Sequence, residues 1–466
     1  MFRRVAIIGG GAAAATLIGE LLERRPPHPL HLDWYTGGDK LARGVAYGTG
    51  SERHLLNVRA ASMSMFAGKP RGFLDFVQRD DAAIAGTDFL PRRRYGDYLE
   101  AEVAHALEQG RAHGHDVHVI PFAVDALVPE RDSVTVIHGE ESHQVDAAVL
   151  ALGTMPPRPL NGVTEAALAS GRYVVDPWKL LADTGIDPPP RTVVVIGLGL
   201  TAVDVLLELS ARWPQTQFIA ISRHGLLPEA HLHAAAAPTG DSAELIESMR
   251  DAPEIRHWLH LLREAIAQDP TTDWRTIIDS LRPQTASLWR GLPAVERGRF
   301  LRHIRPYWDI HRHRMAPPAA ELVDRLRAGG TLRVLRGRIR EVQPGAGLAI
   351  VQYDSCPSGR RETLAVQRVI YATGLQGVRA SGGLVAAMLA SGQARLDGQE
   401  LGLDVTQGLN IIDGDGKVAR NLWALGPIVR GTFWECLAVP DIRQQADQLA
   451  REVVSALAPA SVEVPV

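Results

Sequence analysis

The chain has 466 residues, of which 45% are hydrophobic and 22% charged, and its formal net charge is -3. Because a single hydrophobic core rarely grows beyond about 250–300 residues, this length predicts two or three domains. A slightly negative chain argues against nucleic acid as the main partner, since phosphate binding depends on a positive surface. The apolar runs also fall short of the roughly 20 residues that a membrane span needs.

The two cysteines, Cys356 and Cys436, stand 80 positions apart. This spacing excludes a disulfide framework, a CxxC redox pair and a cysteine-ligated zinc site. An apolar strand is expected almost at the start of the chain, so we expect no cleavable signal peptide before it. The sequence therefore predicts a soluble, cytoplasmic protein.

The first expected unit is a strand, a glycine-rich turn, a helix and a second strand. Val5–Ile8 is a short apolar run typical of a strand buried in a parallel sheet. Gly9-Gly10-Gly11 ends it, Ala12–Arg25 carries apolar residues along one helical face, and Leu30–Tyr35 alternates like a strand. This order predicts a βαβ unit.

The turn of this unit fits the dinucleotide-binding pattern GxGxxA. Gly9 permits the tight turn, Gly11 lets the backbone approach a pyrophosphate, and Ala14 permits close packing of the helix on the strand. Free N–H groups at the helix N-terminus attract the phosphates. The pattern also asks for an acid at the end of the second strand to hold the ribose. Here Asp33 stands before that position and Asp39 after it, and either could substitute.

A second unit of the same design lies in mid-chain, with strands at Thr192–Ile196 and Gln217–Ser222 and a helix at Leu200–Trp213. Gly197, Gly199 and Ala202 repeat the GxGxxA pattern in its turn. Its second strand is followed by Arg223, where an NAD enzyme places a carboxylate. An arginine can grip a 2′-phosphate by paired hydrogen bonds, so the sequence favours NADPH, with NADH as the alternative.

Further motifs follow one another in order along nearly the whole chain. They are Arg43–Gly48, His54–Val58, Met63–Phe66, Pro91–Leu99, Ser222–Pro228, Arg302–Asp309, Gly426–Glu435 and Val439–Arg443. Together they resemble the FAD/NAD(P)-binding family that includes FAD-dependent urate hydroxylases, a distant relative of the N-hydroxylating flavin monooxygenases.

This resemblance implies an α/β fold with two Rossmann-like dinucleotide-binding domains, the NAD(P) domain being inserted into the FAD domain. The FAD domain would take residues 1–172 and 366–466, and the NAD(P) domain with a helical insertion residues 173–365. Ala151–Thr154 and Ala372–Gly374 would be the two crossings between the domains.

The cofactors expected from these patterns are FAD and NADPH. The residues expected to contact them are Gly9, Gly11, Ala14, Arg43, Ala46, Tyr47, Asn57, Met63, Ser64, Gly153, Gly197, Gly199, Ala202, Arg223, Gly374, Gly426, Phe433, Trp434 and Glu435. Asn57 and Ser64 are the candidate catalytic residues, because short polar groups in apolar surroundings suit hydrogen bonding to a flavin edge or a peroxide. Ordinary turn and capping work is an equal interpretation of both.

Two other patterns have more than one interpretation. Six arginines fall within the eighteen residues from Arg297 to Arg314, beside Tyr307 and Trp308. This segment could form a nucleic-acid patch. We favour a solvated helix, part of which contacts the NADPH phosphate or an acidic substrate. His231-x-His233 and His311-x-His313 lack the carboxylate or cysteine spacing of a metal site, so we expect no metal.

The resulting hypothesis is an NADPH-dependent FAD monooxygenase. It would hydroxylate a small molecule, such as an amine, an amino acid or a urate-like compound, with O2 through a flavin C4a-(hydro)peroxide. The alternatives are a flavin oxidoreductase that passes electrons to another acceptor without oxygen insertion, and a redox-sensing flavoprotein that docks a partner. We expect no nucleic-acid or membrane partner.

Overall fold

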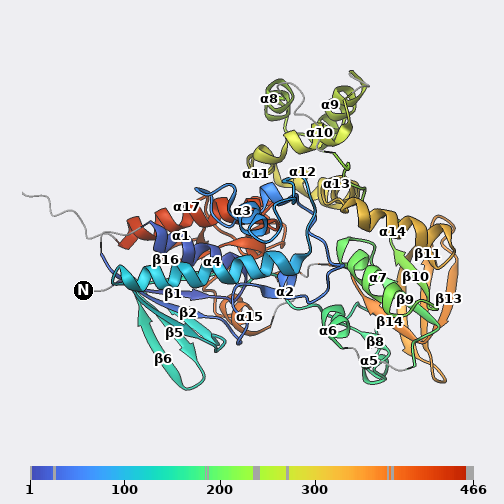
Figure 1. The fold of residues 1–466 in the computed structure, drawn as a ribbon, viewed down its shortest axis with the longest axis horizontal. Coiled ribbons are helices and arrows are strands. Elements are labelled where there is room, and N and C mark those ends of the chain that lie inside the picture. Colours follow the sequence, from blue (N-terminus) through green and yellow to red (C-terminus); the bar gives the residue numbers. More distant parts are fainter. Residues whose placement is uncertain are drawn as a thin grey trace, which may run out of the picture.

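The computed structural model describes residues 3–24, 28–183, 185, 188–234, 242–268, 272–374, 377–378 and 382–457. Within this part, two helix-covered β-sheets lie side by side, and a group of helices projects from their junction (Figure 1). None of the described helices combines the length and the hydropathy needed to traverse a lipid bilayer.

The first sheet takes strands from both ends of the chain. Its order is β15-β16-β7-β1-β2-β3, and all neighbours are parallel except β15 and β16. The strands are β1 (Arg3–Ile8), β2 (Leu30–Tyr35), β3 (Asp116–Ile120), β7 (Ala147–Leu150), β15 (Asn410–Ile412) and β16 (Val418–Ala424). Central β1 is apolar and buried from Val5 to Ile8, as expected for a strand covered on both faces.

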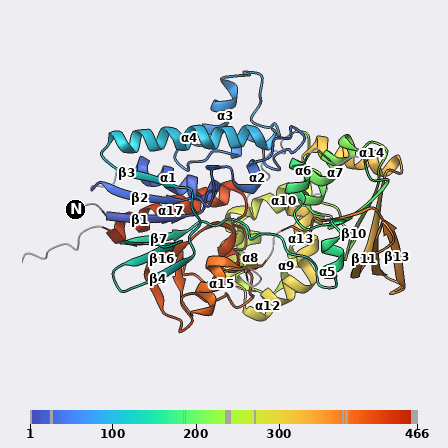
Figure 2. The ribbon, with the colours of Figure 1, turned by 90° about the horizontal axis from the view of Figure 1, so that it is seen from below.

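Helices α1 (Ala12–Glu23), α4 (Arg92–Ala112) and α17 (Val439–Leu457) pack together over this sheet (Figure 2). In α17 the buried residues recur with helical spacing from Ile442 through Leu449 to Val453, which gives the helix one apolar face. A separate antiparallel sheet consists of β4 (Ala126–Pro129), β5 (Val134–His138) and β6 (Glu141–Val145). Shorter helices in this half are α2 (Gly44–Tyr47), α3 (Gly72–Gln78), α15 (Gly383–Ala390) and α16 (Arg430–Phe433), with 3-10 turns at Ala60–Ser62 and Gly426–Val429.

In sequence, all strands of the second sheet come after β7 and before β15, so the second sheet is inserted between the two parts of the first. Its order is β13-β12-β11-β10-β9-β14-β8, parallel from β8 to β11 and antiparallel from β11 to β13. The strands are β8 (Tyr173–Val174), β9 (Thr192–Ile196), β10 (Gln217–Ser222), β11 (Leu332–Pro344), β12 (Ala349–Ser355), β13 (Arg361–Val366) and β14 (Arg368–Tyr371). Its helices are α5 (Glu165–Ala169), α6 (Pro177–Ala182), α7 (Leu200–Arg212) and α14 (Pro317–Ala328).

The helical arm is the chain between β10 and α14, and its outer part projects from the body (Figure 1). It comprises α8 (Ala243–Asp251), α9 (Ile255–Gln268), α10 (Trp274–Ser280), a 3-10 turn (Arg282–Gln284), α11 (Thr285–Gly291), α12 (Ala294–Arg299), the π-helical segment Phe300–Ile304 and α13 (Arg305–Arg312). The predicted α/β fold with one dinucleotide-type unit inserted into another is thus confirmed. The domain limits stay a proposal. Pairing of β14 with β9 favours extending the inserted domain through Tyr371, beyond the expected limit at residue 365.

Candidate functional site

The first glycine turn fits tightly against the end of strand β7. Gly9 has φ +133°, and a Cβ there would lie 2.2 Å from the carbonyl oxygen of Ala151, so only glycine is accommodated. Its N–H donates to the Tyr35 carbonyl at 2.8 Å. Buried Trp34 donates its indole N–H to the Gly9 carbonyl at 2.7 Å. Trp34 therefore helps to fix the turn, a role that the sequence patterns did not reveal.

The other side of the same turn is open. A Cβ on Gly11 would find the Cα of Gly44, at 3.7 Å, as its nearest heavy atom. Gly11 is the N-cap of α1 and has no side-chain hydrogen bond to the first helical turn, which also carries no acidic residue. Ala14 is fully buried beneath it. Free backbone N–H groups facing open space at a helix N-terminus are suited to bind a phosphate.

The second turn repeats this construction. Gly197 has φ +117°, and a Cβ there would lie 2.3 Å from the carbonyl oxygen of Ala372, the residue after β14. Gly199 caps α7 without a side-chain hydrogen bond, and nothing lies within 4 Å of the position of its Cβ. Ala202 is fully buried. Both turns therefore end in a glycine with open space beside it at an uncapped helix N-terminus.

Three further predicted glycines lie where the chain passes close to these turns. Gly153 and Gly374 have φ +69° and +81°, follow β7 and β14, and have no atom within 4 Å of a Cβ position. Gly426, at φ +80°, lies against α1, since its Cβ would approach the Cβ of Ala13 to 3.5 Å. Gly153 and Gly374 thus leave open space beside the turns, whereas Gly426 allows the chain to approach α1 closely.

Of the two acids expected near the ribose of the first dinucleotide, Asp33 and Asp39, one is already paired. Asp33 is 1% exposed, and its carboxylate accepts a hydrogen bond from Arg4 Nε at 2.6 Å and lies 3.0 Å from His31 Nε2. Asp39 is exposed beyond the turn at Gly37. Asp33 thus balances Arg4 inside the sheet, which leaves Asp39 as the acid near the expected ribose position.

Two arginines stand together at the end of β10. Arg223 is exposed, and the parallel register pairs Ser222 with Arg336 on neighbouring β11. The described chain supplies neither guanidinium with a carboxylate within 4.0 Å. Burial, together with the charges of Arg223 and Arg336, lowers the pKa of His224 between them. The sequence pattern identified Arg223 alone, because Arg336 joins it only through strand pairing.

The segment that begins at Arg43 lies beside the first turn, as predicted, but Arg43 itself is engaged. Its guanidinium donates to Asp97 at 2.5 Å and to both oxygens of Glu100, at 2.5 and 2.7 Å, and these bonds raise its pKa. Ala46 is exposed, and burial raises the pKa of Tyr47 to about 12. The expectation that Arg43 contacts a cofactor gains no support from these bonds, because its donors are already used.

Of the two candidate catalytic residues, the structure favours only Asn57. Ser64 is fully buried, and its hydroxyl donates to the carbonyls of Phe66 and Lys69 in its own loop. These bonds support the turn interpretation of Ser64, and Met63 beside it is 1% exposed. Asn57 is partly exposed, and its backbone carbonyl accepts a hydrogen bond from His231 at 3.1 Å.

The predicted residues Phe433, Trp434 and Glu435 end helix α16 and pack on the helical arm. Trp434 is 3% exposed, has φ +57°, and stacks on Trp289 of α11 with ring centroids 4.8 Å apart. Glu435 is buried and forms an ion pair with Arg312 of α13 at 2.7 Å. These side chains attach the arm to the first half of the chain, a role that the sequence did not indicate.

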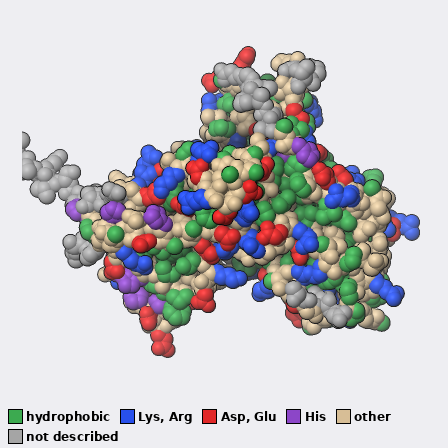
Figure 3. Space-filling model, viewed as in Figure 1, with side chains coloured by type: hydrophobic (Ala, Val, Ile, Leu, Met, Phe, Trp, Pro, Cys, Tyr) green, Lys and Arg blue, Asp and Glu red, His purple; other side chains and the backbone are tan. Residues whose placement is uncertain are grey.

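Within the described ranges, two groups of histidine and carboxylate side chains could hold a metal ion. Neither group includes the histidine pairs His231-x-His233 and His311-x-His313 considered from the sequence. They are His31 with Asp116 and His118, and His138 with Glu141 and His143. In the first group both imidazoles lie at hydrogen-bonding distance, 2.8 Å, from the Asp116 carboxylate. Histidine side chains gather at the end of the molecule that carries β5 and β6 (Figure 3).

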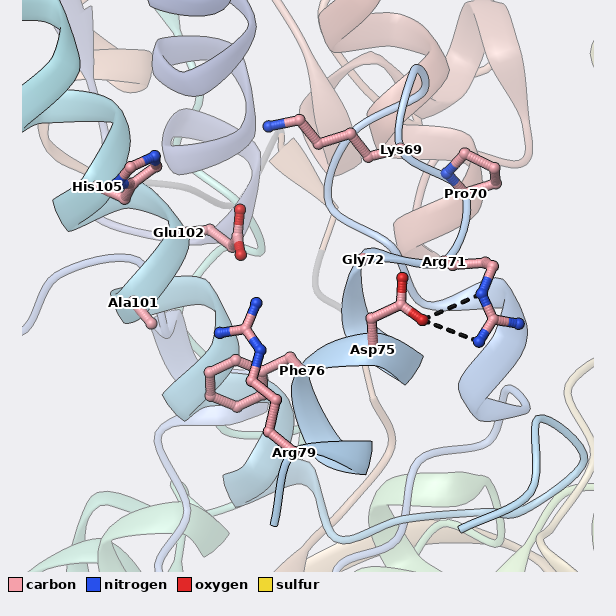
Figure 4. Close-up of a pocket in the computed structure, with 10 residues that line it drawn as sticks. All are labelled: Lys69, Pro70, Arg71, Gly72, Asp75, Phe76, Arg79, Ala101, Glu102 and His105. Carbon is pink, nitrogen blue, oxygen red and sulfur yellow. Dashed lines mark hydrogen bonds and ion pairs between the residues drawn. The ribbon is translucent and has the colours of Figure 1, made fainter. Parts of the chain in front are cut away.

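One groove, of about 680 Å³, lies between α3 and α4 and is separate from both glycine turns. Figure 4 shows Arg71 paired with Asp75 on its wall, and Arg79 beside Phe76 and facing Glu102. Since charges of both signs line it and none of the turn residues reaches it, the groove does not belong to the dinucleotide sites.

Comparisons with known proteins agree with this geometry. Residues 6–155 match the model of the FAD-NAD(P)-binding family. No curated protein matches the sequence. Among solved structures, the chain is similar to an ornithine N-hydroxylase from Kutzneria sp. 744 in its FADred-NADP+-L-orn form, with 16% identity, a TM-score of 0.63, and coverage of 97% of this chain and 99% of that one.

An ornithine hydroxylase from Pseudomonas aeruginosa gives 17% identity, a TM-score of 0.66, and coverage of 98% and 100%. Thioredoxin reductase from Lactococcus lactis gives 11% identity, a TM-score of 0.52, and coverage of 98% and 99%. The protein thus has the two-domain fold of FAD/NAD(P)-binding flavoproteins. Its N-terminal part, residues 6–155, is an FAD/NAD(P)-binding domain. Because oxygenases and reductases share this fold, the fold alone does not determine the reaction.

Proposed function

We propose that the chain is an NADPH-dependent FAD monooxygenase that hydroxylates a small molecule. The observation that carries the proposal is the pair of matching glycine turns, at Gly11 and Gly199, each open to a ligand at an uncapped helix N-terminus. The FAD, when bound, supplies hydride acceptance and oxygen activation. The protein binds, orients and shields the reactants.

We assign FAD to the first turn and NADPH to the second. The N–H groups at the start of α1 hold the FAD pyrophosphate, and Gly426 lets the backbone pass close to it. The N–H groups at the start of α7 hold the NADPH pyrophosphate. Arg223 and Arg336 hold the 2′-phosphate. Neither arginine is paired with a carboxylate, so both are available for a phosphate, which NADPH carries and NADH lacks.

Asn57 is the residue proposed to touch the reacting groups. It is a short polar residue in a partly buried loop, and His231 of the helical arm fixes its backbone. A side-chain amide there can donate one hydrogen bond and accept another, which suits orientation of a flavin edge or a substrate. Disulfide reduction is disfavoured, because Cys436 is buried and Cys356 stands alone on the surface.

The test is to purify the full chain, record its absorbance, and follow NADPH oxidation and O2 uptake together. L-ornithine, L-lysine, cadaverine and urate are suitable first substrates, since three of them are named for similar proteins. Coupled O2 uptake and a hydroxylated product support the proposal. A yellow protein that reduces an artificial acceptor without O2 and yields no hydroxylated product is the flavin oxidoreductase instead.

A further inference from the structure

A small cavity lies where the two halves of the chain meet. Its volume is about 100 Å³, and it is lined by residues of the first crossing, by residues just beyond the second, and by the segment after β16. The lining residues include Gly153, Thr154, Pro427 and Ile428, together with two arginines, Arg305 and Arg430. Such a cavity has room for one small group beside the two guanidinium groups.

Arg430 is a buried cation without a counter-ion. It is 9% exposed, and its Nε has no hydrogen-bond partner. In the described ranges no carboxylate oxygen lies within 4.0 Å of its guanidinium nitrogens. The side chain instead stacks on Trp434, with the guanidinium carbon 4.4 Å from the ring centroid. A buried charge of this kind is costly unless something of opposite charge completes the site.

The acids near Arg430 do not form an ion pair with it. Asp309 pairs with Arg305 at 3.3 Å, Glu435 pairs with Arg312 at 2.7 Å, and buried Asp397 accepts hydrogen bonds from backbone N–H groups. Burial, together with the nearby Arg305, lowers the pKa of Arg430. A bound anion would supply the direct counter-ion that Arg430 lacks.

Trp434 holds this arginine in place at the cost of backbone strain. Its φ of +57° is unfavourable for a large side chain, and such strain persists where the surrounding structure requires it. Here the indole is clamped between Trp289 and Phe300, with ring centroids at 4.8 and 5.1 Å. The guanidinium is thus presented to the cavity in a fixed orientation.

We propose that this cavity binds the carboxylate of an anionic small-molecule substrate, with Arg430 as the main donor and Arg305 as the second. A carboxylate fits the fork of a guanidinium through two parallel hydrogen bonds. The proposal rests on the proposed function for the reaction that this substrate undergoes. It predicts that a purely cationic amine is a poor substrate, because the two arginines repel it.

The test uses thermal unfolding of the purified full chain titrated with acetate and, as a neutral isostere, acetamide. We expect saturable stabilisation by acetate and none by acetamide. Arg430→Gln should weaken acetate binding by about ten- to a hundredfold, the effect of losing a charged hydrogen bond, whereas Arg430→Lys, which keeps the charge but loses the fork, should weaken it less. Without acetate, Arg430→Gln should unfold at the same or a higher temperature, since it removes an uncompensated buried charge.

Exposed Arg327, which lies 3.9 Å from Asp324 on α14, gives the matched control Arg327→Gln, which should bind acetate like the parent. Equal effects of acetate and acetamide would overturn the proposal. A parallel loss of FAD affinity in Arg430→Gln would also overturn it, because the arginine would then serve the flavin. A chain that binds no FAD overturns the proposed function, while the acetate titration of the same preparation still decides the anion site.

Discussion

Gly9 and Gly11 are two residues apart, but the surroundings of Gly9 exclude a side chain, whereas those of Gly11 leave space for one. We expect Gly9→Ala to lower the free energy of unfolding by about 1–3 kcal/mol, because its methyl group meets the Ala151 carbonyl and its φ is unfavourable. Gly11→Ala should leave stability within about 1 kcal/mol, since its φ of -99° suits alanine.

The same pair separates folding from cofactor binding. The added methyl of Gly11→Ala should weaken FAD binding by at least tenfold, as it occupies the space where backbone meets pyrophosphate. Thermal denaturation and flavin absorbance measure the two effects. Retention of normal FAD affinity in Gly11→Ala would contradict the assignment of FAD to this turn.

The two arginines at the end of β10 make a prediction about coenzyme choice. Arg223→Gln and Arg336→Gln should each raise the KM for NADPH by about tenfold and leave the KM for NADH nearly unchanged, because only NADPH carries the 2′-phosphate. Steady-state NAD(P)H oxidation measures both constants. The exposed Arg327→Gln serves as the control for a general loss of positive charge, and a similar rise for both coenzymes would argue against a phosphate site.

Residue types and spacing predicted the glycines well because their role depends on local backbone geometry. Gly9 and Gly197 both have the positive φ that the pattern requires. The same patterns left catalysis and turn work equally open for Ser64, whose hydroxyl bonds within its own loop, and they did not reveal Trp34 or Arg336. These roles depend on which strands and loops become neighbours, information that a single sequence does not contain.

At the scale of elements, helix α4 of the first half meets helix α7 of the second through a buried ion pair. Arg92 and Asp204 lie 2.8 Å apart, and their side chains are 13% and 5% exposed. Burial raises the pKa of Asp204, while Arg92 counters this effect. The ion pair therefore links the two halves, and removal of one partner would leave the other charge buried without a counter-ion.

We expect Arg92→Met to destabilise the protein by about 3–5 kcal/mol, because Asp204 would be left buried without a partner. The double variant Arg92→Met/Asp204→Leu should recover most of this loss. A double-mutant cycle of chemical denaturation measures the coupling. If the single and the double variant were equally unstable, the ion pair would not be what holds α4 on α7.

The order and type of the main elements followed from apolar periodicity. The strands expected at Thr192–Ile196 and Gln217–Ser222 are observed with those bounds, and the two helices after the turns end at Glu23 and Arg212, one or two residues before their expected ends. Periodicity could not show that α11 packs on α16, since that contact joins residues 142 positions apart, as in the hydrogen bond from Trp289 to Gly431.

For the whole molecule, two partly buried histidines predict sensitivity to acid. Burial lowers the pKa of His231 and of His313 to about 4, so both are neutral in the fold. In the unfolded chain they take up a proton near pH 6.5. The unfolded state therefore binds more protons between about pH 6.5 and 4, and stability should fall as the pH drops through this window.

Urea denaturation at about pH 7 and about pH 5 tests this expectation. The parent should lose stability between the two values, and His313→Asn should lose less, because the asparagine takes up no proton in either state. His260→Asn, at an exposed histidine of α9, should behave as the parent does. An equal acid loss in His313→Asn would show that other groups control it.

The helical arm is inserted in the second half of the sequence, yet it holds both halves. Trp289 stacks on Trp434 of the first half, and Met315 at the end of the arm belongs to the buried apolar core of the second half. The arm is thus a brace that adds a third connection to the two places where the chain crosses over. The spacing between the two glycine turns is consequently set by the folded chain, so the two coenzymes that we propose for these turns would meet an arrangement that already exists before they bind.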